Sequence, residues 1–343
     1  MEQTWREAYQ KVQEMIKVSV LVAVYNSEAF LPECLDSLLA QTLHDIEVIC
    51  VDDASTDGSL DVLNRYAEKD SRIKVIHLSQ NGGQAHARNV ALKEAHGEYV
   101  CFLDSDDWFA PDSLKLCSDV FEKYPDTDSV LFRLMMYYDE NNCNEYAMEK
   151  FDKLTGREAF LKSLNWDIHG VYMIRADLHK KYPYDDTEKA YSDDNTSRIH
   201  YIASRNVRYS DAPYYYRQHQ SSVTHAVSPL RFYYMKANES MKRQLIALGE
   251  GKDIIDKYEN IRWLVLIDTY MFYYINRSRL GKEAAKAGLK EMKRIWSDID
   301  YSVLDSRASK FGYRPYANHW FLFRLQEELY FTIRGILGKN EDK

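Results

Sequence analysis

The sequence lacks several patterns that would assign it to a protein class directly. Only five of its 343 residues are cysteines, and their spacing contains no CxxC pair or other metal-type pattern. Most of them lie in apolar or amphipathic runs; the five are Cys34, Cys50, Cys101, Cys117 and Cys143. We therefore expect reduced thiols that mainly pack in the interior of a cytoplasmic protein.

Long apolar runs and an excess of positive charge are also missing. Residues 1–17 are charged and helix-like and lack the apolar centre of a signal peptide, and the run Val20–Tyr25 is too short to cross a bilayer. We expect neither secretion nor membrane insertion by these signals. The formal net charge of −8 argues against nucleic-acid binding. A hydrophobic content of 45% with 29% charged residues is typical of a soluble globular protein.

The first half of the chain does contain apolar strands that alternate with helical patterns. Between the strands we predict helices at 29–40, 59–69 and 84–96; the strands are predicted at 18–24, 46–51, 73–78 and 98–103. Continuous apolar strands joined through helices predict an α/β fold with a parallel sheet covered on both faces.

Polar residues follow each of these predicted strands. The four stretches are Tyr25-Asn26, Asp52-Asp53, Asn81-Gly82-Gly83 and Asp104-Ser105-Asp106-Asp107. Because the carboxyl ends of parallel strands meet at one edge of a sheet, where ligands bind in open α/β folds, the four stretches are expected to form one site.

Asp104 and Asp106 are the candidate metal ligands of this edge. In an extended segment, residues two apart point to the same side, and hard carboxylate oxygens suit Mg²⁺ or Mn²⁺. Two such carboxylates cannot surround a cation, so water and substrate phosphates would complete the shell. The alternative is an acidic turn that caps the helix expected near Pro111.

Three further residues are candidate nucleotide ligands. Asp52 and Asp53 can accept hydrogen bonds from a base or from ribose hydroxyls, or they are solvated turn acids. Arg88, one turn into the helix after Gly82-Gly83, can reach a phosphate or a base carbonyl, or it is a surface cation.

Four stretches in order resemble the successive signatures of family-2 glycosyltransferases. These are SVLVAVYNSEAFLPECLDSLLAQT, IEVICVDDASTDGS, NGGQAHARNVAL and GEYVCFLDSDDW, which together cover residues 17–108. The resemblance implies a GT-A fold, meaning a Rossmann-like, mostly parallel sheet flanked by helices. It also implies a nucleotide-diphosphate-sugar donor, with a uridine nucleotide favoured, a divalent cation (Mn²⁺ or Mg²⁺) and transfer with inversion.

The same resemblance assigns roles to residues of this first half. Tyr25, Asp52 or Asp53, and Arg88 would hold the nucleoside, Asp104 would contact the ribose, and Asp106 would bind the metal. The acceptor would be a glycan or a lipid-linked molecule in polysaccharide or surface-glycan synthesis, which places the protein in the cytoplasm or at the inner face of the cell membrane.

The second half offers a candidate catalytic base. Family members often have an acidic pair before a helix here, and Asp193-Asp194 precedes the helix predicted at 195–203. We assign the base to Asp194, with Asp193 a cap or an alternative base, and with Asp185 and Asp186 as further alternatives. In 212–225, which resembles a tyrosine-rich strand of the family, His219 is a candidate metal or diphosphate ligand, and Arg217 a candidate for neutralising phosphate.

Four other functions are alternatives, and the sequence argues against three of them. A nucleotidyltransferase should have a glycine-rich loop after the first strand, where this sequence reads Val24-Tyr25-Asn26-Ser27-Glu28. A response-regulator-like domain should carry its acidic pair after the first strand, and an oxidoreductase should show G-x-G-x-x-G. A catalytically inactive sugar-nucleotide-binding protein stays open.

We divide the chain into a glycosyltransferase domain, 1–228, and a helical C-terminal region, 229–343. Within the first, 17–110 is the nucleotide-binding half and 111–228 the acceptor half, with a loop expected at 139–153. Helices are predicted at 231–248, 252–276, 282–296 and 320–337. The last helix is aromatic with scattered Arg, and three interpretations stay open: packing on its own domain, a homodimer surface, or a helix lying on a membrane.

Overall fold

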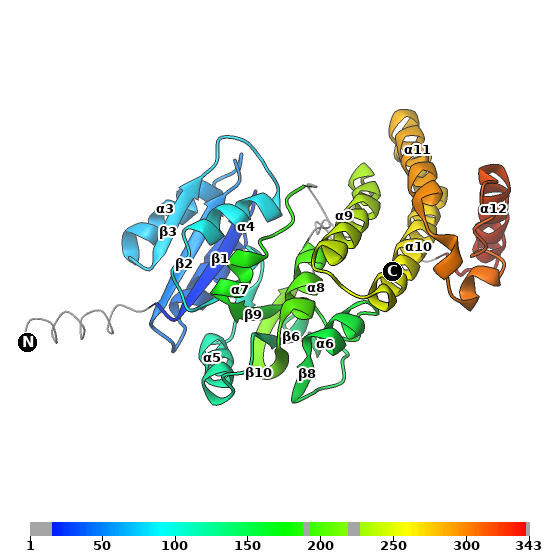
Figure 1. Cartoon of the computed structure of the whole chain (residues 1–343). Coiled ribbons are helices and arrows are strands. Elements are labelled where there is room, and N and C mark those ends of the chain that lie inside the picture. Colours follow the sequence, from blue (N-terminus) through cyan, green and yellow to red (C-terminus); the bar gives the residue numbers. More distant parts are fainter. Residues whose placement is uncertain (1–15, 188–192, 219–226, 341–343) are drawn as a thin grey trace, which may run out of the picture. The chain divides into compact units, whose positions relative to one another are not determined.

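The structure, a computed structural model, describes residues 16–187, 193–218 and 227–340. The chain divides into two compact units, residues 1–219 and residues 220–343, which are described separately below. Figure 1 follows the chain from β1 (blue) to α12 (red).

One ten-stranded mixed sheet forms the centre of the first unit. Its main path runs β3-β2-β1-β4-β9-β6-β10-β5, with β7 paired to β6 and β8 to β10. The strands are β1 (Val18–Val24), β2 (Ile46–Asp52), β3 (Ile73–His77), β4 (Tyr99–Phe102), β5 (Trp108–Phe109), β6 (Ser129–Asp139), β7 (Asn142–Glu145), β8 (Lys153–Thr155), β9 (Tyr172–Arg175) and β10 (Asn206–Arg217).

The first four strands are parallel, as predicted. β1 pairs with β2 on one side and with β4 on the other, and β2 pairs with β3. The side chains of β1, β2 and β4 are mostly apolar and buried, which is why these strands read as continuous hydrophobic runs, whereas the outermost strand β3 fully buries only Ile73. Antiparallel β9 then joins β4 to β6, so the sheet is mostly parallel but mixed.

Helices flank this sheet (Figure 1). Those of the first unit are α2 (Leu31–Leu39), α3 (Ser59–Lys69), α4 (Gln84–Lys93), α5 (Ser113–Lys123), α6 (Gly156–Ser163), α7 (Ala176–Lys181) and α8 (Asp193–Ala203). Helix α4 packs on β1 and β2, while α3 packs on β2 and β3. Four of the five cysteines are buried free thiols and Cys143 is exposed, in line with the packing role predicted for most of them.

The loop predicted at 139–153 is only partly correct: residues 146–152 have no regular structure, but residues 142–145 form a strand. Strand β6 continues to Asp139, and β7 pairs with it antiparallel, with Met135 opposite Glu145. The two residues between the strands, Glu140 and Asn141, form a tight turn. Strand β7 is largely exposed and therefore polar, so its sequence does not show the apolar pattern that predicts a strand.

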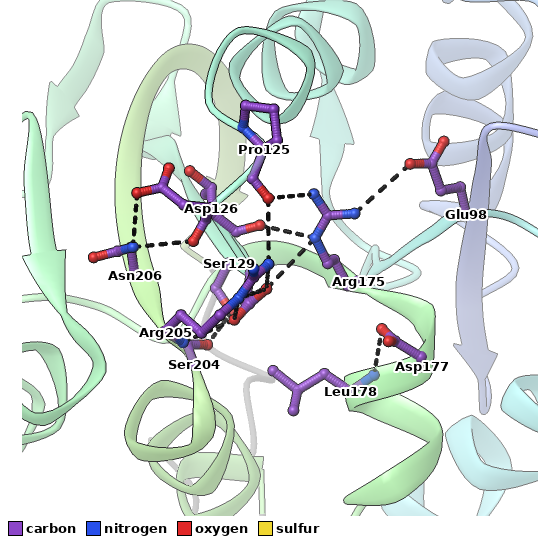
Figure 2. A network of polar contacts seen from close by, with 12 residues as sticks. Glu98, Pro125, Asp126, Ser129, Arg175, Asp177, Leu178, Ser204, Arg205 and Asn206 are labelled. Carbon is purple, nitrogen blue, oxygen red and sulfur yellow. Dashed lines mark hydrogen bonds and ion pairs between the residues drawn. The ribbon is translucent and has the colours of Figure 1, made fainter.

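A polar network supports the edge of the sheet where β6 and β10 begin (Figure 2). Asp128 accepts hydrogen bonds from the backbone N–H of Arg205 at 2.7 Å and from its guanidinium at 2.7–3.1 Å. Arg175, at the end of β9, donates to the carbonyl oxygens of Pro125 and Thr127. This network lies at the amino ends of β6 and β10 and therefore holds the sheet together at the edge opposite their carboxyl ends.

The second unit is built of helices. They are α9 (Tyr233–Ala247), α10 (Lys252–Asn276), α11 (Lys282–Asp298) and α12 (Trp320–Ile336), with short 3₁₀ turns at 229–232, 301–303 and 306–309. Aromatic side chains dominate its core, including Trp263, Trp296 and Phe323. Among the described residues, no helix combines the length and the apolar character that crossing a bilayer requires.

Three buried histidines make the first unit sensitive to acid. His200 on α8 accepts a hydrogen bond from the Tyr172 hydroxyl and donates to the Tyr182 carbonyl oxygen. Its ring lies 4.5 Å from that of His179. Burial lowers the pKa of His200, and likewise that of His169, to about 4; burial, together with the nearby His200 and Arg88, lowers the pKa of His179 well below its usual range. All three are therefore neutral in the folded protein near pH 7.

Lowering the pH from about 7 to about 5 is expected to reduce the free energy of unfolding, because the unfolded chain binds protons at these histidines near pH 6.5 and the folded chain does not. The contribution of these histidines to the free energy of unfolding is present in full above pH 6.5 and is lost as the pH falls toward about 4. Each histidine contributes up to about 1.4 kcal/mol per pH unit.

Urea unfolding at the two pH values measures the effect. His200→Gln should weaken the pH dependence, whereas His96→Gln, at a side chain that is 69% exposed, should leave it unchanged. An unfolding free energy that is equal at both pH values would contradict this account.

Candidate active site

The polar strand ends of the first unit meet at the carboxyl edge of β1, β2 and β4. Val24 at the end of β1 lies opposite Asp52, and Leu21 lies opposite Phe102 in β4, so the segments that follow leave the sheet on the same side. The backbone turns sharply there: Asn26 and Ala54 have positive φ angles of 50° and 60°, which non-glycine residues rarely adopt.

Hydrogen bonds tie these loops together. The Asn26 side chain accepts a bond from the Thr56 N–H at 2.8 Å, and the Asn26 N–H donates to the Ser55 hydroxyl at 3.0 Å. The hydroxyls of Ser27 and Ser105 lie 2.7 Å apart and join the loop after β1 to the acidic turn after β4. The Tyr25 ring stays 49% exposed beside them.

Asp53 organises the loop after β3. It is only 2% exposed, and its two carboxylate oxygens accept the backbone N–H groups of Gly82 and Gly83, both at 2.8 Å. Gly83, immediately before α4, has φ 89°, a backbone conformation that glycine adopts without strain. Asp53 therefore also places a negative charge at the positive end of that helix.

Asp52 is fully buried. One carboxylate oxygen lies 2.7 Å from Nδ1 of His77, and the other is buried without a hydrogen-bond partner among the described residues. The alternative that Asp52 and Asp53 are solvated turn acids is therefore wrong. Asp52 therefore holds the imidazole ring of His77, whose side chain is 49% exposed.

Arg88 is buried rather than a surface cation, with 2% of its surface exposed. Its guanidinium donates to a carboxylate oxygen of Asp104 and lies 4.0 Å from the Phe102 ring and 5.4 Å from that of Tyr184. Gln84, in the first turn of α4, donates to the same Asp104 oxygen at 2.9 Å. Helix α4 thus fixes the Asp104 carboxylate from one side.

The acidic residues after β4 form a turn, and not the extended segment that the spacing suggested. The Asp107 N–H donates to the Asp104 carbonyl oxygen at 3.0 Å, which closes the turn. Asp104 and Asp106 remain partly exposed, whereas Asp107 is 1% exposed. The three carboxylates therefore differ in environment, and only the first two can meet a ligand.

Asp107 is the internal support of this turn. Its carboxylate accepts the Tyr214 hydroxyl at 2.7 Å and the Arg217 N–H at 2.8 Å, and the Tyr214 oxygen in turn accepts the Asp104 N–H at 3.2 Å. Burial, together with the neighbouring charges of Asp104 and Asp106, raises the pKa of Asp107 well above its usual range. Strand β10 thereby determines where the acidic turn lies.

Arg217 also belongs to this support. Its guanidinium donates to the Asp106 carbonyl oxygen at 2.9 Å, forms an ion pair with Glu33, and lies 4.5 Å from the Trp108 ring. The candidate metal ligand Asp106 is held through its backbone, and its partly exposed carboxylate presents hard oxygen donors. Across residues 16–187, 193–218 and 227–340, no three His, Cys, Asp or Glu side chains are arranged to hold a metal ion. His219, the other candidate ligand, lies outside the described residues.

Asp194 lies in the first turn of α8 and is partly exposed. The helix begins at Asp193, so the capping position precedes both acids. Two residues on, the Thr196 hydroxyl accepts the Asp185 N–H at 3.3 Å, which links this turn to the segment whose Tyr184 ring packs on Arg88. Asp186 lies 3.5 Å from the ring of His86, whose side chain is 47% exposed.

Comparisons with known proteins identify the family. The family model for Glycosyl transferase family 2 matches residues 19–183. The chain is 34% identical over 208 residues to UDP-Glc:alpha-D-GlcNAc-diphosphoundecaprenol beta-1,3-glucosyltransferase WfaP of Escherichia coli, a match that covers 60% of this chain and 79% of WfaP. The chain belongs to the family-2 glycosyltransferases.

This glycosyltransferase is also 35% identical over 222 residues to the putative glycosyltransferase EpsH of Bacillus subtilis, a match that covers 60% of this chain and 62% of EpsH. The chain thus spans less than two thirds of that relative. Its fold resembles the crystal structure of S. aureus TarS 1–349 in complex with UDP-GlcNAc, with a TM-score of 0.70 and 23% identity over 92% of this chain and 91% of that one. The predicted GT-A fold, a mostly parallel sheet flanked by helices with further helices at the C-terminus, is confirmed.

The sequence of the glycosyltransferase did not identify the residues that support the acidic turn from other elements of the fold. Tyr214 and Gln84 were assigned no role, because nothing in the sequence shows that β10 and the first turn of α4 both lie beside the turn after β4. Tyr214 stands in a run of three tyrosines, and only the structure shows that it is the buried one, at 1% exposure.

Tyr214→Phe is expected to lower the free energy of unfolding of the glycosyltransferase by about 1–3 kcal/mol, because Asp107 keeps its buried carboxylate and loses a donor. Urea unfolding measures this. Tyr215→Phe is the matched control, since that partly exposed ring stacks on Trp108 at 5.1 Å and phenylalanine preserves the stacking. Equal effects of the two substitutions would show that the Tyr214 hydroxyl does not support Asp107.

Proposed function

We propose that this glycosyltransferase moves a hexose from a UDP-sugar to a hydroxyl group of a glycan or lipid-linked acceptor in the synthesis of a surface polysaccharide. The donor and acceptor classes are supported by similarity: WfaP is named for UDP-Glc and a diphosphoundecaprenol acceptor, and a TarS structure contains UDP-GlcNAc. The observation that carries the proposal is the acidic turn at the carboxyl edge of the sheet.

The turn separates supporting acids from acids that can meet a donor. Asp107 is occupied by Tyr214 and the Arg217 N–H, so it serves as a buried support. Asp104 and Asp106 stay partly exposed above it, and Arg88 with Gln84 hold the Asp104 carboxylate in place. An anionic oxygen in this position suits a ribose hydroxyl, and the exposed Tyr25 ring offers a stacking surface for the base.

The residue proposed to hold a divalent cation is Asp106. Its carboxylate is a hard oxygen ligand, and Mg²⁺ sites commonly use one or two carboxylates together with substrate phosphates, which fits a single acid at the rim of the turn. When bound, Mn²⁺ or Mg²⁺ would neutralise negative charge on the leaving diphosphate. His219 remains a proposed second ligand.

The proposed catalytic base is Asp194. It would accept the proton of the acceptor hydroxyl, whose oxygen forms a bond to the anomeric carbon while the bond from that carbon to the diphosphate oxygen breaks. The configuration at the anomeric carbon would be inverted, as the family resemblance implies. The partial exposure of Asp194 in the first turn of α8 suits contact with an acceptor, and the helix terminus stabilises its anionic form.

A donor screen tests the whole proposal. Nucleotide sugars are added with Mn²⁺ to the full chain, and both thermal stabilisation and nucleoside-diphosphate release are recorded. UDP-sugars should stabilise the protein and release UDP. Stabilisation without release, also when acceptors are supplied, would favour an inactive sugar-nucleotide-binding protein. Equal stabilisation by UDP, GDP and CDP would argue against a specific uridine pocket.

Asp106→Asn should lower turnover by roughly 100-fold, since a cation contributes several kcal/mol to stabilising the leaving group. Mn²⁺-dependent UDP binding should be lost, while the melting temperature stays the same because the side chain is partly exposed. Calorimetric titration of UDP with and without Mn²⁺ measures this, with the exposed Asp61→Asn as the control. Wild-type metal dependence in the Asp106 variant would remove this residue from the metal site.

Asp194→Asn should lower kcat by about 10²–10⁴-fold, the usual contribution of a positioned base, with UDP-sugar affinity almost unchanged. Asp177→Asn is the matched control, because Asp177 is an exposed acid in the first turn of α7. Turnover, donor binding and melting temperature are measured on both variants. A near-normal kcat for Asp194→Asn would move the base to Asp193 or Asp186.

A further inference from the structure

Helix α12 places its apolar residues on the outside. Every exposed residue between Trp320 and Ile336 is apolar, glycine or threonine; the apolar ones are Phe321, Leu322, Leu325, Leu329, Ile333 and Ile336. Phe321 is 76% exposed and Ile336 is 80% exposed. The spacing of three or four residues between most of them aligns them along one face for the length of the helix. We call this surface the α12 face.

The opposite side of α12 packs against the core of its own unit. Phe323 and Phe331 are buried in the aromatic core, and the helix contacts α10. Glu328 forms an ion pair at 2.8 Å with Arg277, the residue that follows α10, so the charge beside the α12 face is neutralised inside the chain. Packing on its own unit, one of the three interpretations of this helix, is therefore correct for one side only.

The fully exposed charged side chains near the α12 face have one sign. Within residues 306–340 the exposed charged side chains are Arg307, Lys310, Arg314 and Lys339. Arg307 is paired with Asp305 at 2.7 Å, which leaves three exposed cations near the helix. The segment that carries two of them packs along α12, because Tyr313 and the exposed Phe311 both contact the Tyr330 ring.

This unit as a whole is basic. Residues 220–343 contain 21 Lys and Arg against 15 Asp and Glu, a formal charge of +6, although the complete chain has −8. An apolar helix face bordered by cations is the pattern of helices that lie in the interface of an anionic bilayer. With 17 residues, α12 suits lying along that surface.

We propose that the α12 face docks on a membrane surface that contains anionic lipid. Leu322, Leu325, Leu329, Ile333 and Ile336 enter the boundary between headgroups and acyl chains, and Lys310, Arg314 and Lys339 meet lipid phosphates. The proposal does not depend on the function proposed above.

A second copy of the chain fits this surface less well. A two-fold interface brings the same patch of both copies together, so the cations that border the α12 face would meet cations. The acid that might pair with them, Glu328, already binds Arg277 in its own chain. Apolar contact alone would favour dimers, but the surrounding charge favours an anionic surface.

The test is flotation of the full chain with vesicles of phosphatidylcholine, with and without phosphatidylglycerol. We expect binding to the mixed vesicles and much weaker binding to phosphatidylcholine alone. Leu325→Gln with Leu329→Gln should weaken the partition at least about tenfold, because the bilayer would then take up two fewer leucine side chains. Lys310→Gln and Lys339→Gln should each weaken it about fivefold on the anionic vesicles only.

Ile246→Gln is the matched control, since Ile246 is a 57% exposed apolar residue of α9 in the same unit. It should bind vesicles like the wild type, and circular dichroism should show all variants folded. Sedimentation velocity without lipid completes the test. Absence of vesicle binding, equal binding by the leucine variant, or a dimer that the leucine variant dissociates would each overturn the proposal.

Discussion

Burying a carboxylate costs several kcal/mol unless other donors replace its water, and this constraint governs the carboxyl edge of the sheet. Asp52, Asp53 and Asp107 are each at most 2% exposed. Their partners come from elsewhere in the chain: His77 from β3, Gly82 and Gly83 from the following loop, and Tyr214 from β10. Each buried acid therefore joins its own strand to another segment, and together they connect β2, β3, β4 and β10 around one site.

This arrangement explains why the exposed acids can be held firmly without being buried themselves. Asp104 receives Arg88 and Gln84 from α4, and its backbone N–H is held by Tyr214. The Asp106 backbone is held by Arg217. Side chains whose positions are fixed before a ligand arrives lose little entropy on binding, and this preorganisation is what charge-stabilising sites require. The supporting acids thus act on a ligand indirectly, through the geometry of their neighbours.

The sequence was sufficient for features that depend on local pattern. The strand at Val18–Val24 and the helix at Ser59–Lys69 have the predicted bounds, because apolar periodicity and turn residues determine both. The sequence was insufficient for features that depend on contacts between segments far apart in the chain. Nothing local shows that Arg88 is buried against Asp104, that 104–107 closes into a turn, or that a polar stretch after Asp139 returns as a strand. The family resemblance identified which residues matter, while their partners required the three-dimensional structure.

The sequence of helix α12 likewise does not show which of its sides is buried. Apolar side chains lie on both of its sides, so its periodicity does not tell which side packs inward. Phe323 and Phe331 are buried because α10 and its neighbours surround them, and Leu325 and Leu329 are exposed because nothing in the described part of the second unit covers them. A helix with apolar side chains on both sides is normally enclosed. Exposing a continuous row of leucine and isoleucine to water is unfavourable, so the exposed side of α12 is expected to be covered by an apolar medium. The surrounding cations favour a medium whose surface is negatively charged.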